Sequence, residues 1–220
     1  MRSTASFLVR GISLLAVVAG LLSAGPAFAQ SCGFSGQLNM SPETLAESEP
    51  VQGNAEASLL LVEFFDPNCP HCQDFKPVMD QVMEQYGDRV RYYKQPVPLW
   101  QFSRPQIRAI LLAKQQGKYY DMIDAQLQSP NAGRGGMTTD QLVSLAEGIG
   151  IDGGWMREKL TSGAMQSAVN RLPYEARKAG VQSTPTLAIG RKVVGNRSAA
   201  CIGQLIEQEL SASASASSGS

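Results

Sequence analysis

One segment carries most of the structural information: Leu59-Leu60-Leu61-Val62-Glu63-Phe64-Phe65-Asp66-Pro67-Asn68-Cys69-Pro70-His71-Cys72. Its first seven residues are almost continuously apolar, which is typical of a strand buried on both faces of a sheet. Asp66-Pro67-Asn68 then predicts a turn. From Cys69 to about Tyr86, apolar residues recur at helical spacing, and Pro77 inside this predicted helix should kink it. We therefore expect a buried strand that leads into a helix through a short turn, with two cysteines where the helix begins.

The rest of the chain predicts an α/β fold. Arg89 to Gln95 predicts a second strand, and only helices are predicted between residues 103 and 180. Two short strands then precede a last helix, so the order of elements is strand, helix, strand, helical block, strand, strand, helix. The expected helices of the block are 108–114, 119–127, 139–147 and 154–179 with breaks, and the later elements are 187–189, 193–194 and 196–210.

Two segments flank these elements. Residues 30–57 are polar and turn-rich, and they predict one short helix that begins after Ser41 with Pro42 in its first turn. Residues 211–220 contain only Ser, Ala and Gly, a composition that predicts a disordered tail.

Residues 1–29 have the three-part pattern of a secretory signal peptide. Arg2 and Arg10 are followed by an uncharged apolar run, and Ala27-Phe28-Ala29 offers small residues where a signal peptidase reads them. The run from Gly11 to Leu22 is shorter than the roughly 20 residues that a membrane-spanning helix needs. We expect cleavage after Ala29 and a mature protein in an exported, oxidising compartment, where disulfides form and persist.

The composition excludes several classes of protein. Hydrophobic residues make up 43% of the chain and charged residues 17%, which is incompatible with global disorder. The 19 basic and 19 acidic residues balance, and no basic run is present, so we expect no nucleic-acid partner. His71 is the single histidine, which excludes a site with several histidine ligands within one chain.

The Cys69–Cys72 pair is open to three interpretations: half of a zinc site, a structural disulfide or a redox pair. No second pair of ligands at short spacing completes a zinc site, and a disulfide that closes so small a loop stabilises a fold little. At the start of a helix, free N–H groups and the helix dipole favour a thiolate on Cys69. The context therefore favours a redox pair in which Cys69 attacks and Cys72 resolves, with no metal.

Three further residues accompany this pair. The imidazole of His71 should stabilise the Cys69 thiolate and make the disulfide a stronger oxidant. Glu63, six residues before Cys69, is an acid in an apolar strand, so it is expected to be buried and to move the proton of Cys72. Pro185 opens a short strand and is either an ordinary strand opener or a cis proline that would leave the Thr184 backbone free for an incoming strand.

These motifs resemble the thioredoxin superfamily, and within it the bacterial periplasmic DsbA-like thiol:disulfide oxidoreductases. The resemblance spans about residues 55–210 and rests on residues 62–65, on Cys69-Pro70-His71-Cys72 and on Thr184-Pro185-Thr186. It implies a thioredoxin fold with an inserted helical domain and no cofactor beyond the redox-active disulfide. It also implies that Glu63 is the family's buried acid, Pro185 its cis proline, and Pro70-His71 the mark of its oxidising branch. The implied thioredoxin-like domain is 58–102 with 181–210, and the implied insert is 103–180.

Two departures from the DsbA pattern point elsewhere. DsbA itself usually has Val before the cis proline, whereas the DsbC, DsbG and ScsC-like proteins have Thr, as Thr184 here. The segment from Phe65 to Pro70 also resembles the DsbG branch. Those isomerases carry a long dimerisation arm, and residues 30–58 are too few for such a domain, so we expect a monomer.

Cys32 and Cys201 remain. A disulfide between them is the one pairing of the four cysteines that leaves Cys69 and Cys72 free to exchange. Free thiols or an intermolecular bond are the alternatives.

Three functions are consistent with the sequence. The first is a donor of disulfides to reduced or unfolded exported proteins, reoxidised by a quinone-linked membrane oxidase. The second is an isomerase or reductase that a membrane electron donor keeps reduced. The third is a protein whose reduced dithiol binds Cu(I), although the eight methionines are spaced like core residues.

Overall fold

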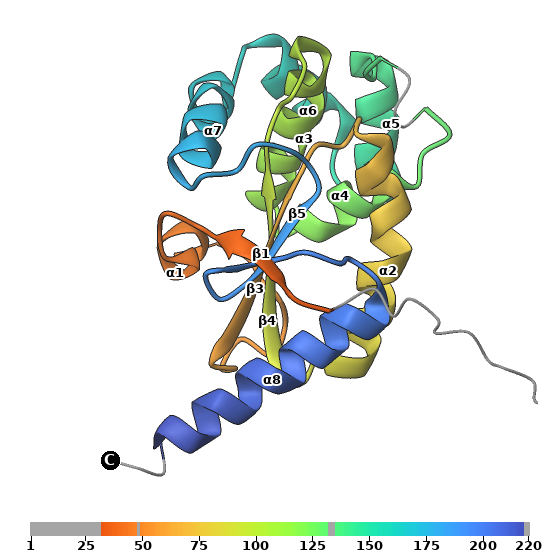
Figure 1. Ribbon diagram of the computed structural model, residues 1–220. Coiled ribbons are helices and arrows are strands. Elements are labelled where there is room, and N and C mark those ends of the chain that lie inside the picture. Colours follow the sequence, from red (N-terminus) through yellow and green to blue (C-terminus); the bar gives the residue numbers. More distant parts are fainter. Residues whose placement is uncertain (1–31, 48, 132–134, 218–220) are drawn as a thin grey trace, which may run out of the picture. The chain divides into compact units, whose positions relative to one another are not determined.

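The expected buried strand and the helix after it form the centre of the fold (Figure 1). The structure is a computed structural model that describes residues 32–47, 49–131 and 135–217, so the expected signal peptide lies outside the described residues. Strand β3 covers Leu59–Phe65, and all seven of its residues are buried. Helix α2 covers Pro70–Tyr86, with Pro77 inside it.

The described strands form one six-stranded sheet in the order β1-β6-β5-β3-β4-β2. Strand β4 (Val90–Pro96) is parallel to β3, whereas β5 (Thr186–Ile189) is antiparallel to it on the other side. Strand β6 (Lys192–Val194) pairs antiparallel with β5. Strand β3 therefore has a hydrogen-bonded neighbour on both sides, which agrees with its continuous apolar sequence.

Both edges of the sheet come from the segment before β3, where the sequence predicted only a short helix. That helix is present as α1 (Pro42–Ala46), but β1 (Phe34–Gln37) also pairs with β6, and β2 (Gln52–Gly53) pairs with β4. Three of the four residues of β1 are exposed, and β2 has only two residues. Neither strand therefore has the alternation of apolar and polar residues that makes a strand recognisable.

Each face of the sheet has its own helical layer. Helices α2 and α8 (Ala199–Ser217) pack against each other and cover one face (Figure 1). Helix α1 and the helices between β4 and β5 belong to the core on the other face. The fold is thus a thioredoxin fold with a helical insertion, and the predicted fold class is confirmed.

The described residues of the insertion form a short 3₁₀ turn and five helices. The predicted helix 154–179 is broken between α6 and α7. There Gly163 and Met165 adopt positive φ angles of 77° and 65°. Thr138 and Gln141 form a reciprocal capping box at the start of α5. The elements are η1 (Gln101–Ser103), α3 (Arg104–Lys114), α4 (Tyr119–Leu127), α5 (Thr139–Gly148), α6 (Gly153–Thr161) and α7 (Gln166–Lys178).

The prediction of a disordered tail from residue 211 is wrong for residues 211–217, which continue α8 to Ser217. Alanine has the highest helix propensity of all residues, and it alternates with serine here. The hydroxyls of Ser213 and Ser215 donate to the carbonyls of Glu209 and Ser211, one helical turn earlier, at 2.9 and 3.0 Å. These bonds keep the two hydroxyls paired within the helix. Residues 218–220 lie outside the described residues.

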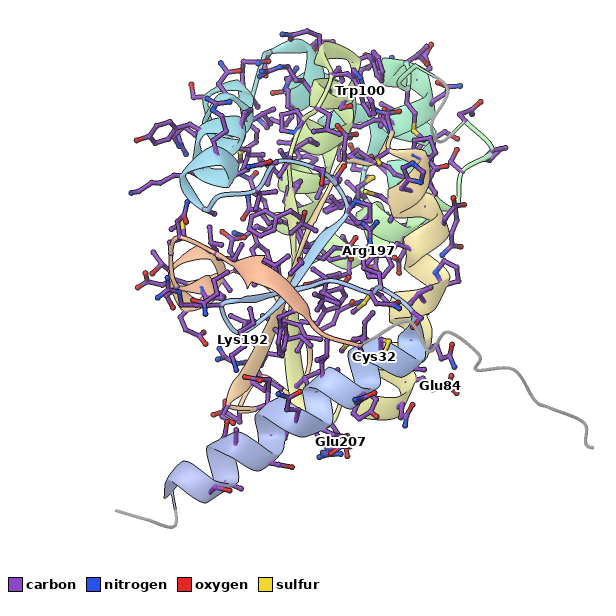
Figure 2. The ribbon with its side chains drawn as sticks, viewed as in Figure 1. Cys32, Glu84, Trp100, Lys192, Arg197 and Glu207 are labelled. Atoms are coloured by element: carbon purple, nitrogen blue, oxygen red, sulfur yellow. A yellow bond between two sulfur atoms is a disulfide. The ribbon has the colours of Figure 1, made fainter. Side chains whose placement is uncertain are left out.

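Cys32 and Cys201 form a disulfide, as the sequence predicted. The bond joins the segment before β1 to α8, and Figure 2 shows Cys32 beside that helix. Cys69 and Cys72 are both free thiols in this structure, so the pair is in its reduced form. Among the described helices, none is long and apolar enough to cross a membrane.

We expect replacement of the disulfide by Cys32→Ser and Cys201→Ser together to lower the free energy of unfolding. The two cysteines are 169 residues apart in sequence. A loop of this length corresponds to at most about 4–5 kcal/mol in the chain-entropy model. Urea denaturation of both proteins measures the difference. Equal midpoints for the variant and the wild type, both oxidised, would show that the bond does not stabilise the fold.

Candidate active site

Cys69 is the N-cap residue of α2, and only 4% of its surface is exposed. Pro70 occupies the first turn and has no N–H group, so the first backbone donors of the helix are those of His71 and Cys72. The Cys72 thiol and the backbone N–H groups of Cys72 and His71 stabilise negative charge on the Cys69 sulfur. These hydrogen bonds lower the pKa of Cys69 from 9.0 to about 5, even though partial burial opposes the shift.

Cys72 lies one turn further along α2 and is completely buried. Burial raises the pKa of its thiol well above 9.0, and its hydrogen bond to Cys69 and the charge of Glu63 act in the same direction. Near neutral pH the two sulfurs therefore differ in chemistry. Cys69 is a thiolate that can attack, and Cys72 keeps its proton.

The loop before β5 faces this pair. The Thr184–Pro185 peptide bond is cis, which decides between the two interpretations of Pro185 that the sequence left open. The carbonyl oxygen of Thr184 lies 3.4 Å from the sulfur of Cys69 and accepts a hydrogen bond from it when Cys69 is protonated. The guanidinium group of Arg197, labelled in Figure 2, donates to the carbonyl oxygen of Pro185 and lies over the ring of Phe75.

Glu63 is buried, as expected, and only 1% of its surface is exposed. One carboxylate oxygen accepts a hydrogen bond from the hydroxyl of Tyr92 and lies 3.5 Å from the ammonium nitrogen of Lys94. The other oxygen has no hydrogen-bond partner among the described residues. The acid is thus held by two groups on one side and has a free acceptor on the other.

Sequence reasoning missed both partners of Glu63. Lys94 is a buried lysine in strand β4, as Glu63 is a buried acid in β3. The two residues are direct neighbours in the parallel pairing of β3 with β4. The sequence contains an acid and a base in the two predicted strands of one strand–helix–strand unit. This could have predicted that Glu63 and Lys94 pair, because a buried charge needs a partner.

The turn before Cys69 is held by Asp66. One of its carboxylate oxygens accepts from the backbone N–H of Asn68, and the other accepts from that of Leu99, both at 2.7 Å. Burial raises the pKa of Asp66 above its usual 3.8, while these backbone hydrogen bonds oppose the rise. Asp66 therefore ties the turn to the segment that follows β4.

Asn68 extends from this turn into the insertion. Its side-chain nitrogen donates to the hydroxyl of Ser103 at 3.1 Å and to the side-chain oxygen of Gln106 at 2.7 Å. The side chain of Gln126 in turn donates to the backbone carbonyl of Gln106. We call these four residues, Asn68, Ser103, Gln106 and Gln126, the buried amide cluster, because none is more than 2% exposed.

The buried amide cluster was also missed from sequence. Gln106 and Gln126 occupy the buried faces of α3 and α4, where an apolar residue is the rule. The cluster links the residue before Cys69 to two helices of the insertion.

Pro70 and His71 are exposed at the start of α2. His71 contributes its backbone N–H to the environment of the Cys69 sulfur. The role of its imidazole stays a prediction. Within the described ranges, no three His, Cys, Asp or Glu side chains are grouped as metal ligands.

The chain belongs to the thioredoxin family, because the family model described as Thioredoxin matches residues 45–208. The resemblance noted from sequence is therefore confirmed at the level of the superfamily.

Several solved structures are similar to this one, and two of them serve as examples. BdbD from Bacillus subtilis has a TM-score of 0.69 and 24% sequence identity, covering 81% of this chain and 98% of its own. The thiol-disulfide exchange protein alpha-DsbA2 from Wolbachia pipientis has a TM-score of 0.64 and 22% identity, covering 76% and 90%. At these identities, the two structures support the shared fold.

Among curated proteins, a Na(+)/H(+) antiporter NhaA from Herminiimonas arsenicoxydans is 25% identical over 169 residues. The match includes 76% of this chain and 27% of the antiporter. The chain thus spans about a quarter of the length of this curated relative, and the match concerns that part alone.

We expect the Cys69 thiol of the reduced protein to titrate with a midpoint near pH 5. Thiolate absorbance at 240 nm, followed from pH 3 to 10, measures it. The Cys69→Ser variant should lose the transition, because Cys72 stays protonated over this range. A midpoint near 9, the value of an ordinary thiol, would contradict the proposed thiolate stabilisation.

The same pKa makes the stability of the reduced protein depend on pH. The folded pKa lies below that of the unfolded thiol, so between about pH 8 and 5 the unfolded state binds more protons. We expect the reduced form to lose stability relative to the oxidised form as the pH falls through this range, and to level off below 5. Urea unfolding of both forms at pH 8, 6.5 and 4 tests this; a constant difference would contradict it.

We expect Asn68→Leu to lower the free energy of unfolding by about 1–3 kcal/mol, because it leaves buried polar groups of Ser103 and Gln106 unpaired. Gln116→Leu replaces an exposed amide with the same apolar residue and should change stability by less than about 0.5 kcal/mol. Equal effects of the two substitutions in urea denaturation would show that the buried amide cluster does not contribute to the free energy of unfolding.

Proposed function

We propose that the protein is a thiol–disulfide oxidoreductase that donates its Cys69–Cys72 disulfide to folding exported proteins. The observation that carries this proposal is the difference between the two sulfurs. Cys69 lies at a helix start with a pKa of about 5, and Cys72 is buried and keeps its proton.

In the proposed reaction, a substrate thiolate attacks the sulfur of Cys69. A substrate–Cys69 disulfide forms, the Cys69–Cys72 bond breaks, and Cys72 leaves and takes up a proton. A second substrate thiolate then attacks the substrate sulfur of the mixed disulfide and releases Cys69 as a thiolate. The substrate loses two electrons and gains a disulfide, and the protein becomes the dithiol.

The low pKa of Cys69 favours the oxidising direction. A stabilised thiolate lowers the free energy of the reduced protein, so the disulfide form gives up its bond readily. It also makes Cys69 a good leaving group from the mixed disulfide. Glu63, with its free carboxylate oxygen, is the candidate proton acceptor or donor for Cys72.

The cellular setting is part of the proposal. The signal-like residues 1–29 and the Cys32–Cys201 disulfide support an oxidising, exported compartment, which we take to be the periplasm. There, a monomeric protein would oxidise reduced or unfolded exported proteins, and a quinone-linked membrane oxidase would restore its disulfide.

One observation favours a second candidate function. Thr184 is buried, and its hydroxyl has no hydrogen-bond partner among the described residues, although its carbonyl faces Cys69. Threonine here resembles the isomerase branch. In that case a membrane electron donor would keep Cys69 and Cys72 reduced.

The redox state of the pair in living cells distinguishes these candidates. Acid quenching, alkylation with a heavy maleimide and mass mapping of the labelled cysteines measure it. We expect Cys69 and Cys72 to be mainly oxidised and unlabelled. A pair found mainly reduced would overturn the donor role in favour of the isomerase or reductase.

We expect Cys69→Ser to abolish oxidation of a reduced dithiol peptide, because it removes the attacked sulfur. Cys72→Ser should accumulate mixed disulfides with substrates, visible on non-reducing gels. The variant that lacks both Cys32 and Cys201 should remain active under conditions in which it is folded. Normal activity of Cys69→Ser would refute the assignment of Cys69 as the sulfur that exchanges with substrate.

A further inference from the structure

A groove lies beside the active site where three segments meet: the end of α7, the segment after β4 and the loop before β5. Its volume is about 230 Å³. Ten residues line it, among them Val97, Leu99, Pro173, Arg177 and Thr184.

Thr184 connects this groove to the reacting sulfur, because its carbonyl oxygen lies 3.4 Å from the sulfur of Cys69. The backbone N–H of Thr184 makes no hydrogen bond with any residue that the structure describes. The backbone of an extended peptide whose cysteine reacts with Cys69 can therefore accept a hydrogen bond from the N–H of Thr184. The peptide residues on one side of that cysteine would then lie in the groove.

Arg177 is the one charged residue among the ten that line the groove. Its side chain is exposed and makes no ion pair or hydrogen bond with the described residues. The other charged side chains of this part of α7 do not compensate it, and the adjacent Lys178 is basic as well. Arg171 and Glu175 line a separate cavity of about 630 Å³ next to α1 and α3. The groove therefore has an uncompensated positive charge in an otherwise uncharged lining.

We propose that Arg177 selects substrates with an acidic side chain close to the reacting cysteine. This inference rests on the proposed function and specifies its substrate class. A Glu or Asp in the groove would pair with Arg177, whereas a Lys or Arg would be repelled. Because the guanidinium is exposed, the preference should be modest, about two- to fivefold in rate, and salt should weaken it.

The test uses the oxidised full-length protein and reduced peptides that contain two cysteines. The peptides are identical except for Glu, Gln or Lys, placed in turn at each of the four positions on either side of the first cysteine. Reduction of Cys69–Cys72 by the peptide is followed by stopped-flow fluorescence. A neighbouring charge also alters the peptide thiol itself, so each rate is divided by the rate of the same peptide with an uncharged reference disulfide, bis(2-hydroxyethyl) disulfide.

We expect the wild type to react fastest with Glu peptides at one or two positions on one side of the cysteine. Arg177→Gln should abolish this preference, and Arg177→Glu should reverse it toward Lys. The matched control Arg171→Glu, on the same helix with the same change of charge, should keep the wild-type order. Urea denaturation confirms that each variant is folded. If Arg177→Glu does not fold, the loss of preference in Arg177→Gln is a sufficient test.

Equal normalised rates for Glu, Gln and Lys peptides would overturn the inference while leaving the proposed function intact. An equal shift by Arg171→Glu and Arg177→Glu would also overturn it, because the effect would then come from net charge. Failure of the wild type to oxidise any peptide would instead count against the proposed function itself.

Discussion

The active site depends on holding one sulfur as an anion beside another that keeps its proton. The helix start supplies the N–H groups that stabilise Cys69, and the protein interior supplies the burial that keeps Cys72 neutral. Both conditions require a turn of only four residues between a fully buried strand and the helix. Strand β3 meets this requirement because hydrogen-bonded neighbours and helical layers leave none of its residues exposed.

Two polar groupings lie in the interior around this turn, where each would be costly if incompletely paired. Glu63 is paired with Lys94 and Tyr92 beneath the cysteines, and the buried amide cluster holds Asn68 against the insertion. The first grouping keeps a carboxylate close to Cys72. The second joins the position of Cys69 to the packing of α3 and α4. The insertion is thus connected to the chemistry through hydrogen bonds as well as through apolar contacts.

The central elements and the cysteine pair were predictable because their signals are local. Continuous apolar sequence identified β3, and two cysteines separated by two residues at a helix start identified the redox pair. Long-range information was needed for the rest. The edge strands β1 and β2 are defined by their partners, and Lys94 acquires meaning only from its register with Glu63. The tail was mispredicted because an Ser/Ala-rich composition suits both disorder and a helix.

The disulfide between Cys32 and Cys201 has a consequence for how the chain matures. During synthesis Cys32, Cys69 and Cys72 emerge long before Cys201, so for most of that time only wrong partners are available to Cys32. Strand β5, which is the second hydrogen-bonded neighbour of β3, is also synthesised late. The same is true of α8, which covers one face of the sheet together with α2. Correct pairing of all four cysteines is therefore decided by the final residues, and any oxidant that acts earlier on the growing chain works against it.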